Sequence, residues 1–578
     1  MQVTKVSDAL GKIFSEPILS LLEQNLSDCD VILYQPVGKI IASVNGVRRF
    51  AQDSAYAESR ALLSEIVRRS PHLFVAPEYS IPWTALKDAI TSGDRPQFGH
   101  LWALGCESIT RNELETFIAA IHDSATVICE PLDGITDSRT GFLDPLVYVF
   151  RATDAQGLEN LILLIQFKTH PSVDNERIEC GGLRLGNCVY KFGDKVKSNQ
   201  LVSFICSDSM ALPPEQILLD LCEKTLLLHI QLNPDPRHNA YRAYRDWLFQ
   251  HAERTTQLIC LNWARGVTAQ GDDNNKVDNL TDNAASAWYL RPERFNYHDD
   301  AIDNNHREGL YYTWLEPLKV NVLCFNYTPS LFVLKSTKVW QGLVPQAQKT
   351  VQGPRLLSTL QFNENAISWE NRAIPLCDGF KPLIKKYKTC AKQLKSIYDR
   401  SPVAVERLLA LTAGDVKSDN PWYSVTHVDA FTTDSSEIVR RITFAQDSSP
   451  SADQFRKRRI GYFVELHAEL GAGAELPPAM RRLKGASYKF DWEYNLPTSN
   501  VHVKRGPPAT IIYVGVGLLE DDFDNIWRRI SQHRRNGEDE DQFCIYYRHG
   551  IKLEYWVPPR VREFMRQSDG PLTDIANQ

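Results

Sequence analysis

The sequence predicts a layered α/β domain followed by a second, α+β region. Short apolar runs rich in β-branched residues alternate with segments whose apolar residues recur at helical spacing, from residue 29 to about residue 365. From residue 370 onward the composition changes and basic clusters interrupt this alternation. At 578 residues the chain is also too long for one ordinary domain. We therefore expect an N-terminal helical segment (1–28), a main domain (29–365) and an accessory region (370–578).

The composition narrows the class of protein further. Hydrophobic residues make up 43% of the chain, enough for sizeable cores, and the net charge of −6 gives no general attraction for nucleic acids or anionic membranes. Residues 1–20 lack the pattern of a signal peptide, and no apolar run reaches the length of a membrane span. The twelve cysteines are scattered without a C-x-x-C pair, which favours a reducing, cytoplasmic location and no zinc site.

The first half of the main domain alternates strand and helix patterns. Residues 1–28 before it show helical spacing and are expected to form one or two helices. Strands are expected over 31–36, 73–76, 101–105 and 125–129, and helices over 55–69 and 113–123. Two further strands, 146–152 and 161–167, are joined by a hairpin-like turn at 154–157.

The second half continues this alternation and then breaks it. Strands are expected over 201–205, 226–232, 257–263, 320–326 and 331–335, and helices over 214–223 and 240–253. Residues 268–308 are rich in Asp and Asn and are expected to form a surface insertion. Beyond residue 370 the basic clusters are typical of solvated faces, and 510–517 predicts a short strand.

Three chemically complementary residues stand at the ends of predicted strands. Glu78 follows the strand at 73–76, Lys168 follows 161–167, and Cys206 follows 201–205. Each alone is ordinary, since free cysteines are usually buried in cores and Glu and Lys usually lie at the surface. Together they fit one chemistry, because a carboxylate can take a proton from a thiol and an ammonium can stabilise an oxyanion.

This set of residues resembles the nitrilase, or carbon–nitrogen hydrolase, superfamily. The similar fragments follow the family order: Ile32-Leu33-Tyr34-Gln35, Phe74-Val75-Ala76-Pro77-Glu78, Leu104-Gly105-Cys106-Glu107, the hairpin from Gly157 to Lys168, Ile205-Cys206-Ser207-Asp208, and Cys260-Leu261-Asn262-Trp263-Ala264-Arg265-Gly266. The resemblance spans roughly residues 29–340. It implies an α-β-β-α sandwich, a homo-oligomer (dimer or larger), and no metal or cofactor.

The resemblance also implies roles for individual residues. Glu78 would be the base, Cys206 the nucleophile, and Lys168 with the Ser207 N–H the oxyanion stabilisers. Ser207 departs from the family, which commonly has a bulky residue after the nucleophile. A second glutamate often braces the lysine, and of the two candidates Glu176 is preferred over Glu179. The implied reaction is hydrolysis of a small-molecule amide or nitrile, or acyl transfer if an amine replaces water.

Several alternatives remain open on the sequence. His170 is a candidate base for Cys206, as in papain-like sites. The insertion carries Trp288, Tyr289, Phe295 and Tyr297, which favour a lid over the site or, as the alternative, an oligomer contact. A different class is a nitrilase-like effector or assembly component of a bacterial defence system. Its accessory region would then bind a protein or, less expectedly, nucleic acid.

Overall fold

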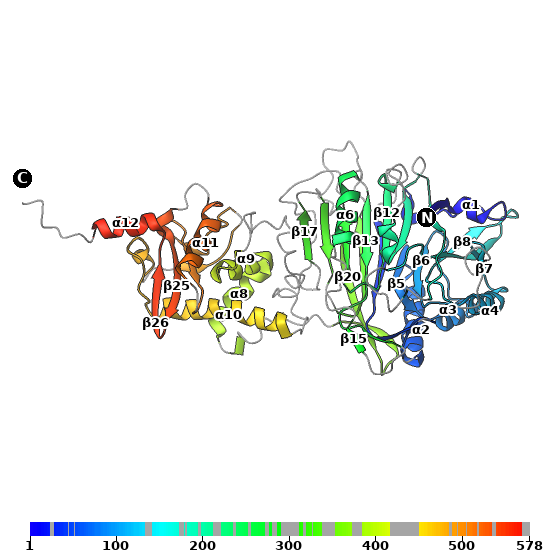
Figure 1. The fold of residues 1–578 in the computed structure, drawn as a ribbon, viewed down its shortest axis with the longest axis horizontal. Coiled ribbons are helices and arrows are strands. Elements are labelled where there is room, and N and C mark those ends of the chain that lie inside the picture. The colour runs from blue at the N-terminus through cyan, green and yellow to red at the C-terminus, as the bar shows by residue number, and fades with distance from the viewer. Residues whose placement is uncertain are drawn as a thin grey trace, which may run out of the picture. The chain divides into compact units, whose positions relative to one another are not determined.

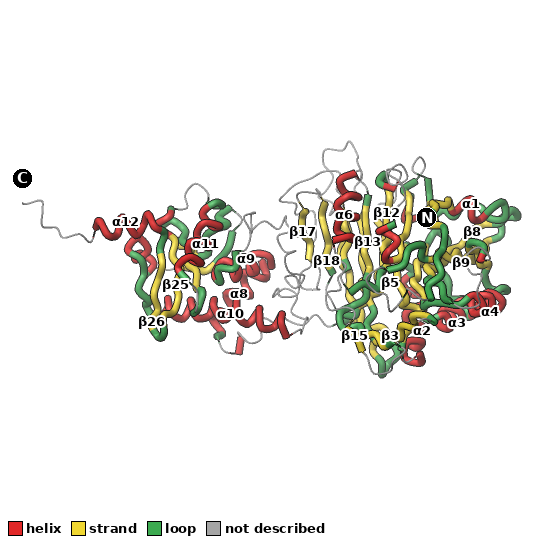
Figure 2. Tube along the Cα trace, viewed as in Figure 1, coloured by secondary structure: helices red, strands yellow, loops and turns green. Residues whose placement is uncertain are grey.

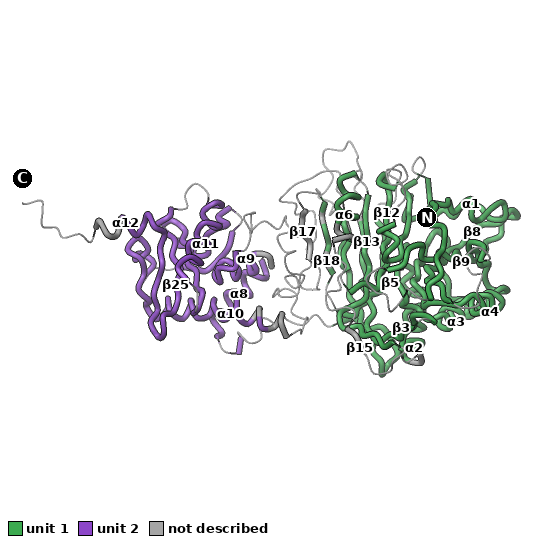
Figure 3. Tube along the Cα trace, viewed as in Figure 1, with its two compact units in different colours: residues 1–374 green, residues 375–578 purple. Residues whose placement is uncertain are grey.

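The computed structural model divides into two compact units, residues 1–374 and 375–578 (Figure 3). It describes residues 1–23, 28–43, 45–50, 52–132, 141–172, 179, 182–194, 198–211, 221–234, 239–251, 256–271, 277–279, 286–290, 311–315, 320–325, 328–337, 353–372, 384–385, 387–400, 402–416, 450–484, 488–493, 495–504, 506–516, 519–534 and 539–568. Among the helices described, none has both the length and the apolar composition needed to cross a membrane.

The first unit contains a nine-stranded mixed sheet (Figures 1 and 2). Its strands, in spatial order, are β21 (Ser368–Asn371), β20 (Gly353–Asn363), β19 (Ser330–Thr337), β2 (Asp28–Gln35), β5 (Leu73–Ile81), β6 (Leu101–Cys106), β8 (Pro145–Thr153), β9 (Glu159–Phe167) and β7 (Thr126–Cys129). β2, β5 and β6 are parallel neighbours, and every residue of β5 is buried. Near-continuous apolar runs are typical of such central parallel strands, because both faces are covered.

A second, eight-stranded sheet lies against the first. Its order is β1 (Gln2–Lys5), β10 (Cys188–Phe192), β11 (Gln200–Ile205), β12 (Thr225–Ile230), β13 (Gln257–Leu261), β16 (Ala287–Leu290), β18 (Val320–Cys324) and β17 (Tyr311–Leu315). β11, β12 and β13 are parallel, so their carboxyl ends share one edge of the sheet. A smaller sheet pairs β15 (Val277–Asn279), β14 (Thr268–Gln270), β3 (Lys39–Ser43) and β4 (Gly46–Arg49).

An apolar core lies between the two large sheets. Leu201 and Ile205 of β11 join β5 residues such as Val75 in this core. Successive side chains of a strand point to opposite faces, so Phe204 points the other way and contacts Tyr244 of α6 (Asn239–His251). The outer face of the nine-stranded sheet is covered by α2 (Gln52–Arg69), α3 (Trp83–Thr91) and α4 (Arg111–Ile121). The mixed α/β class expected from the sequence is therefore confirmed.

The N-terminal segment differs from expectation. Residues 2–5 form β1, which pairs with β10 as a sheet edge, and only a short helix α1 (Val6–Leu10) and a 3-10 turn η1 (Ser20–Leu22) follow. The expectation of one or two helices over residues 1–28 is therefore wrong for residues 2–5, which form a strand. Ile13 and Ile18, which set part of the helical spacing, are 67% and 66% exposed and face no core.

The insertion at 268–308 also differs from expectation. Its described parts are β14, β15 and β16, and β16 lies between β13 and β18 in the eight-stranded sheet. Trp288 of β16 is buried in the core between the sheets, so the expected aromatic lid or oligomer contact is wrong for this residue. Phe295 and Tyr297 lie outside the described residues, as does most of the helix expected over 214–223. The nine-stranded sheet also continues to β21, past the expected end at residue 365.

The second unit combines helices with a three-stranded sheet. Its elements are α8 (Lys388–Arg400), α9 (Pro402–Thr412), α10 (Pro450–Gly471), η7 (Pro478–Leu483), β22 (Tyr488–Phe490), β23 (Val501–Val503), β24 (Thr510–Tyr513), α11 (Glu520–Ser531), η8 (Glu540–Gln542), β25 (Phe543–His549), β26 (Lys552–Trp556) and α12 (Pro559–Ser568). β24, β25 and β26 form the sheet, and the unit has its own apolar core. Two arginines of the basic cluster, Arg458 and Arg459, form ion pairs with Asp415.

Candidate active site

Glu78 lies in an irregular part of β5. The pairing of β5 with β6 shifts register between Ala76 and Ile81, and Tyr79 has a φ of 57°, in the left-handed region. The main chain of this bulge lies close to Gly105 of β6. A Cβ at Gly105 would be 2.1 Å from the carbonyl oxygen of Pro77. The carbonyl of Glu78 accepts a hydrogen bond of 2.7 Å from the Trp263 indole. Bulges commonly re-aim one side chain, and this one presents the carboxylate of Glu78.

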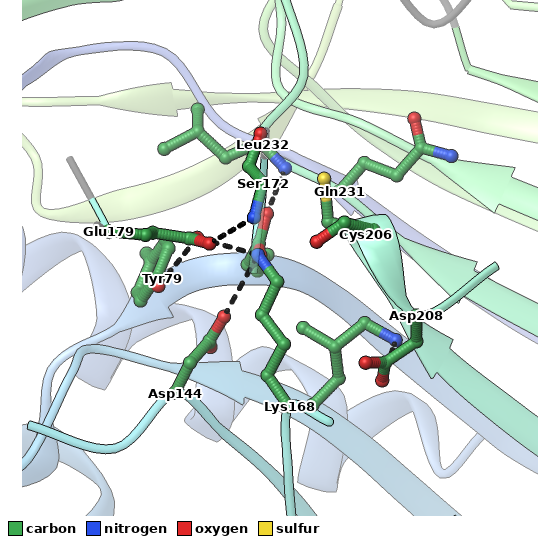
Figure 4. A network of polar contacts seen from close by, with 12 residues as sticks. Tyr79, Asp144, Lys168, Ser172, Glu179, Cys206, Asp208, Gln231 and Leu232 are labelled. Carbon is green, nitrogen blue, oxygen red and sulfur yellow. Dashed lines mark hydrogen bonds and ion pairs between the residues drawn. The ribbon is translucent and has the colours of Figure 1, made fainter. Parts of the chain in front are cut away.

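Lys168 follows directly after β9 and is fully buried. Its Nζ lies 2.8 Å from Glu78 Oε1 and 2.6 Å from Glu179 Oε1 (Figure 4). Asp144 Oδ2 is 3.7 Å away, and the Asp144 carbonyl accepts a hydrogen bond from the Lys168 N–H. One ammonium is therefore held among three buried carboxyl groups.

Glu179 is the second glutamate at this lysine. Its Oε1 also accepts a hydrogen bond of 3.2 Å from the Tyr79 hydroxyl, and its Oε2 accepts one of 2.8 Å from the Ser172 N–H. The bracing contact is thus made by the alternative candidate of the sequence analysis, whereas Glu176, the preferred one, lies outside the described residues. Spacing alone did not separate the two, because they lie only three residues apart in the sequence.

Cys206 begins a 3-10 turn, η3 (Cys206–Met210), directly after β11. Its φ of 42° is uncommon for a non-glycine residue, and such strain is often found at functional sites. The sulfur lies 3.4 Å from the hydroxyl of Tyr241 on α6. The Cys206 carbonyl accepts a 2.7 Å hydrogen bond from His229 Nε2, and Gln231 Nε2 donates to His229 Nδ1. These contacts fix the main chain at the thiol.

Asp208 joins the turn at Cys206 to the segment after Lys168. Its Oδ1 accepts hydrogen bonds from the N–H groups of Thr169 and His170, and its Oδ2 accepts one from the Ile205 N–H. Ser207 Oγ donates to the His170 carbonyl at 2.6 Å. His170 thus contributes its main chain, and within the described part of the chain no hydrogen bond joins its ring to Cys206. The papain-like alternative gains no support from this geometry.

Burial and the neighbouring charges shift the pKa values of Cys206, Glu78 and Lys168. Burial raises the pKa of the Cys206 thiol well above its usual range, the charge of Glu78 adds to this, and Lys168 opposes it. Burial also raises the pKa of Glu78, against the effect of Lys168. The ammonium of Lys168 is disfavoured by burial, but the charges of Glu179 and Glu78 outweigh this and raise its pKa. These directions favour the neutral thiol and the ammonium, and the contacts of Glu78 with Lys168 Nζ and the Leu232 N–H suit its ionised form.

The carboxyl groups of Glu78, Asp144 and Glu179 are also the one arrangement with metal-ligand geometry among the described residues. One oxygen from each lies within 4.8 Å of the others. The ammonium of Lys168 contacts all three, so it takes the place that a cation would have. The arrangement is a salt-bridge cluster around a lysine.

The structure brings Glu78, Lys168 and Cys206 together from three segments far apart in the sequence. The charges of Glu78 and Lys168 both act on the Cys206 thiol, and Ser207 lies beside it in the turn. Asp144, His229 and Tyr241 also lie at this site, although no sequence pattern singles them out. Asp144 precedes a strand and is typical of a turn, while Tyr241 shares the ordinary amphipathic pattern of α6.

No family model matches the chain, and no curated protein matches it by sequence. A solved CN-hydrolase superfamily protein from Xanthomonas campestris, with an arsenic adduct in its active site, is similar with 12% identity and a TM-score of 0.24 over 45% of this chain and 80% of its own. A glutamine-dependent NAD+ synthetase from Acinetobacter baumannii, solved with ADP, is similar with 10% identity and a TM-score of 0.30 over 77% of this chain and 73% of its own. At these levels of similarity the function has to be argued from the site itself.

Proposed function

We propose that this protein is a thiol-dependent hydrolase that cleaves a non-peptide C–N bond, in an amide or a nitrile, through a Cys206 thioester. The observation that carries the proposal is the buried contact of 2.8 Å between Lys168 Nζ and Glu78 Oε1 beside the Cys206 thiol. A base, an oxyanion stabiliser and a nucleophile are then buried together at one site. The two sheets with helices on their outer faces support the nitrilase type of α-β-β-α sandwich as the fold of the first unit.

The geometry suits each step for an amide substrate. Glu78 takes the proton of the Cys206 thiol, and the thiolate attacks the carbonyl carbon. Glu78 Oε1 contacts Lys168 and Oε2 accepts a 2.6 Å hydrogen bond from the Leu232 N–H, which fixes the carboxylate. Glu78 then returns the proton to the leaving amine, and a water activated by Glu78 hydrolyses the thioester to release the acid and restore the thiol.

Lys168 and the N–H of Ser207 would stabilise the tetrahedral oxyanion. An ammonium has three N–H donors, and Glu78 and Glu179 accept two of those of Lys168. The third makes no hydrogen bond to Asp144, whose Oδ2 is 3.7 Å away, and would serve an oxyanion that forms next to Cys206. Preorganised donors of this kind cost no reorganisation during the reaction, because the folded site already holds them in place.

The test is hydrolysis of a panel of primary amides and nitriles, measured as ammonia release by the full chain. Cys206→Ala should abolish release, and Cys206→Ser should nearly do so, because a hydroxyl is a far poorer nucleophile at neutral pH. The matched control is Cys260→Ala, which removes an equally buried cysteine from β13 in the same sheet. Full activity of Cys206→Ala would refute the proposal.

A further inference from the structure

Asp144 is a buried carboxyl group that the mechanism above does not use. It lies directly before β8 and has no exposed surface. No hydrogen bond of ordinary geometry reaches either carboxylate oxygen within the described part of the chain, although the side chains of Glu78 and Tyr79 face this carboxyl group closely enough to share one. Its main chain, by contrast, is held, because its carbonyl accepts a 2.9 Å hydrogen bond from the Lys168 N–H. An ionised carboxylate buried without donors is costly, so the protonation state of Asp144 needs an explanation.

The surroundings of Asp144 carry too much negative charge for a third ionised carboxylate. Glu78 and Glu179 both accept hydrogen bonds from Lys168 and from main-chain N–H groups, which suits their ionised forms. The groups that face Asp144 are Glu78 and Tyr79 of β5, Cys106 of β6, Lys168 after β9, and Glu179. Lys168 is the single cation among these five. Three ionised carboxylates around it would leave a net charge of about −2 among buried side chains.

We propose that Asp144 is a neutral carboxylic acid at neutral pH and shares its proton with Glu78, which makes it a positioning residue for that base. The Asp144 O–H would donate to the Glu78 carboxylate, and the other Asp144 oxygen would face the Lys168 ammonium at 3.7 Å. This arrangement gives both unpartnered oxygens a role and leaves the cluster with one unit less negative charge. Burial, followed by the charge of Glu78, raises the pKa of Asp144 well above its usual range, in agreement.

The role of Asp144 rests on the proposed function of Glu78 as the base. An ionised Asp144 would repel the Glu78 carboxylate and hold Glu78 in its protonated form, which cannot take the thiol proton. A neutral donor has the opposite effect, because a hydrogen bond to the ionised form lowers the pKa of a carboxyl group. Asp144 would thus keep Glu78 ready to act without touching the substrate.

Infrared spectroscopy tests the protonation state without any substrate. The full chain at neutral pH should show the C=O stretch of a protonated carboxyl group, and Asp144→Asn should remove that part of the band. The matched control is Asp491→Asn. Asp491 is also a buried aspartate, but its contacts with Arg400 and Lys489 lower its pKa, so its loss should leave the band unchanged. A wild-type chain without the band, or a band that persists in Asp144→Asn, would overturn the proposal.

The pH profile of hydrolysis tests the positioning role. Asp144→Leu removes the donor to the Glu78 carboxylate and should move the acid limb of kcat/KM to higher pH by about one unit. The reason is that a hydrogen bond to the ionised carboxylate lowers the proton affinity of Glu78 by about tenfold. Asp144→Asn keeps a donor and should restore the wild-type limb. If both variants moved the limb to lower pH, Asp144 would be ionised in the wild type and the inference would be wrong. The infrared result is independent of the reaction, so failure of the proposed function would be recognised separately.

Discussion

At the scale of single residues, the site depends on one buried ammonium. Lys168 contacts Glu78, Glu179 and Asp144, and none of these four side chains is more than 4% exposed. Removing one partner from a buried ionic cluster leaves the others uncompensated, which costs more than the pair contributes. Lys168 therefore has a structural role as well as the proposed catalytic one.

Replacing Lys168 separates these two roles. Lys168→Ala should lower the rate of hydrolysis by at least about 10²–10³, the usual cost of one oxyanion donor. Lys168→Arg keeps a positive charge for Glu78 and Glu179 but should not restore the rate, since guanidinium is a planar fork rather than a compact charge. Single-turnover kinetics and thermal unfolding of both variants would measure the two effects. A rate within about tenfold of wild type in either variant would remove Lys168 from the mechanism.

His229 makes the stability of the first unit sensitive to acid. Burial lowers its pKa to about 3, whereas an unfolded histidine titrates near 6.5. Below about pH 6.5 the unfolded state therefore binds a proton that the folded state does not, and this contribution to stability is lost as the pH falls towards 3. Asp208 acts in the opposite direction, because burial raises its folded pKa to about 6.

The change His229→Gln isolates this effect, since the contribution of Asp208 is present in both proteins. Between pH 6 and 4 the free energy of unfolding of the wild type should fall with decreasing pH more steeply than that of the variant, by about 1.4 kcal/mol per pH unit. Urea denaturation at stepped pH measures both slopes. Equal slopes would mean that His229 is protonated in the folded protein.

At the scale of elements, the site is built by an irregular strand. The bulge of β5 at Pro77–Ser80 aims Glu78 at Lys168, and the absent side chain of Gly105 leaves room for it. A Cβ at position 105 would also lie 2.7 Å from the Glu78 Cα, so the contact is with main chain that cannot rotate away. The position of Glu78, the proposed base, therefore depends on a glycine in the neighbouring strand.

Gly105→Ala should displace the bulge and with it Glu78. Misplacing a catalytic group by about 1 Å can cost on the order of 10²-fold in rate, and we expect a loss of that size. The control is Gly461→Ala in α10, where an added Cβ meets nothing within 4 Å. Hydrolysis rates and melting temperatures of both variants would be compared. Wild-type activity in Gly105→Ala would show that the bulge does not position Glu78.

The sequence predicts the elements whose pattern is strong and misses those whose pattern is short. Long apolar runs identify β2, β8, β9 and β11 because central strands bury both faces. β16 was missed because its four residues stand in an Asp/Asn-rich segment, although Trp288 is core. β1 was missed because its exposed and half-buried residues leave no apolar run.

The site residues that could be predicted stand next to long apolar runs in the sequence. Glu78, Lys168 and Cys206 stand next to strong strand patterns, so their convergence could be expected, while their catalytic roles stay predictions. Asp144 reaches the site because β8 pairs between β6 and β9, and such pairing is long-range information that local spacing does not contain. Tyr241 comes from a helix, whose rotation relative to the thiol depends on packing.

At the scale of the whole molecule, the proposed active site belongs to the first unit alone. Glu78, Lys168, Glu179 and Cys206 all lie within residues 1–374, and the second unit has a separate apolar core. In that unit, Arg458 and Arg459 form ion pairs with Asp415. Binding of protein or nucleic acid by residues 375–578, a role in defence and a homo-oligomeric state stay predictions.

Residues 1–374 expressed alone should keep the proposed chemistry. Because the proposed site and both large sheets lie within this unit, the fragment should hydrolyse the same amide or nitrile as the full chain, within about tenfold in kcat/KM. Circular dichroism would check that the fragment folds, and light scattering would compare the assembly of both proteins. A folded fragment without activity would place part of the site in the second unit.

The covalent intermediate is the most direct test of the account. The full chain would be mixed with an active amide from the panel, quenched in acid within the first turnover, and its peptides mapped by mass spectrometry. We expect an acyl group on Cys206, absent from Cys206→Ala and present in Cys260→Ala. Turnover without any acylated cysteine, or acylation at a cysteine other than Cys206, would contradict it.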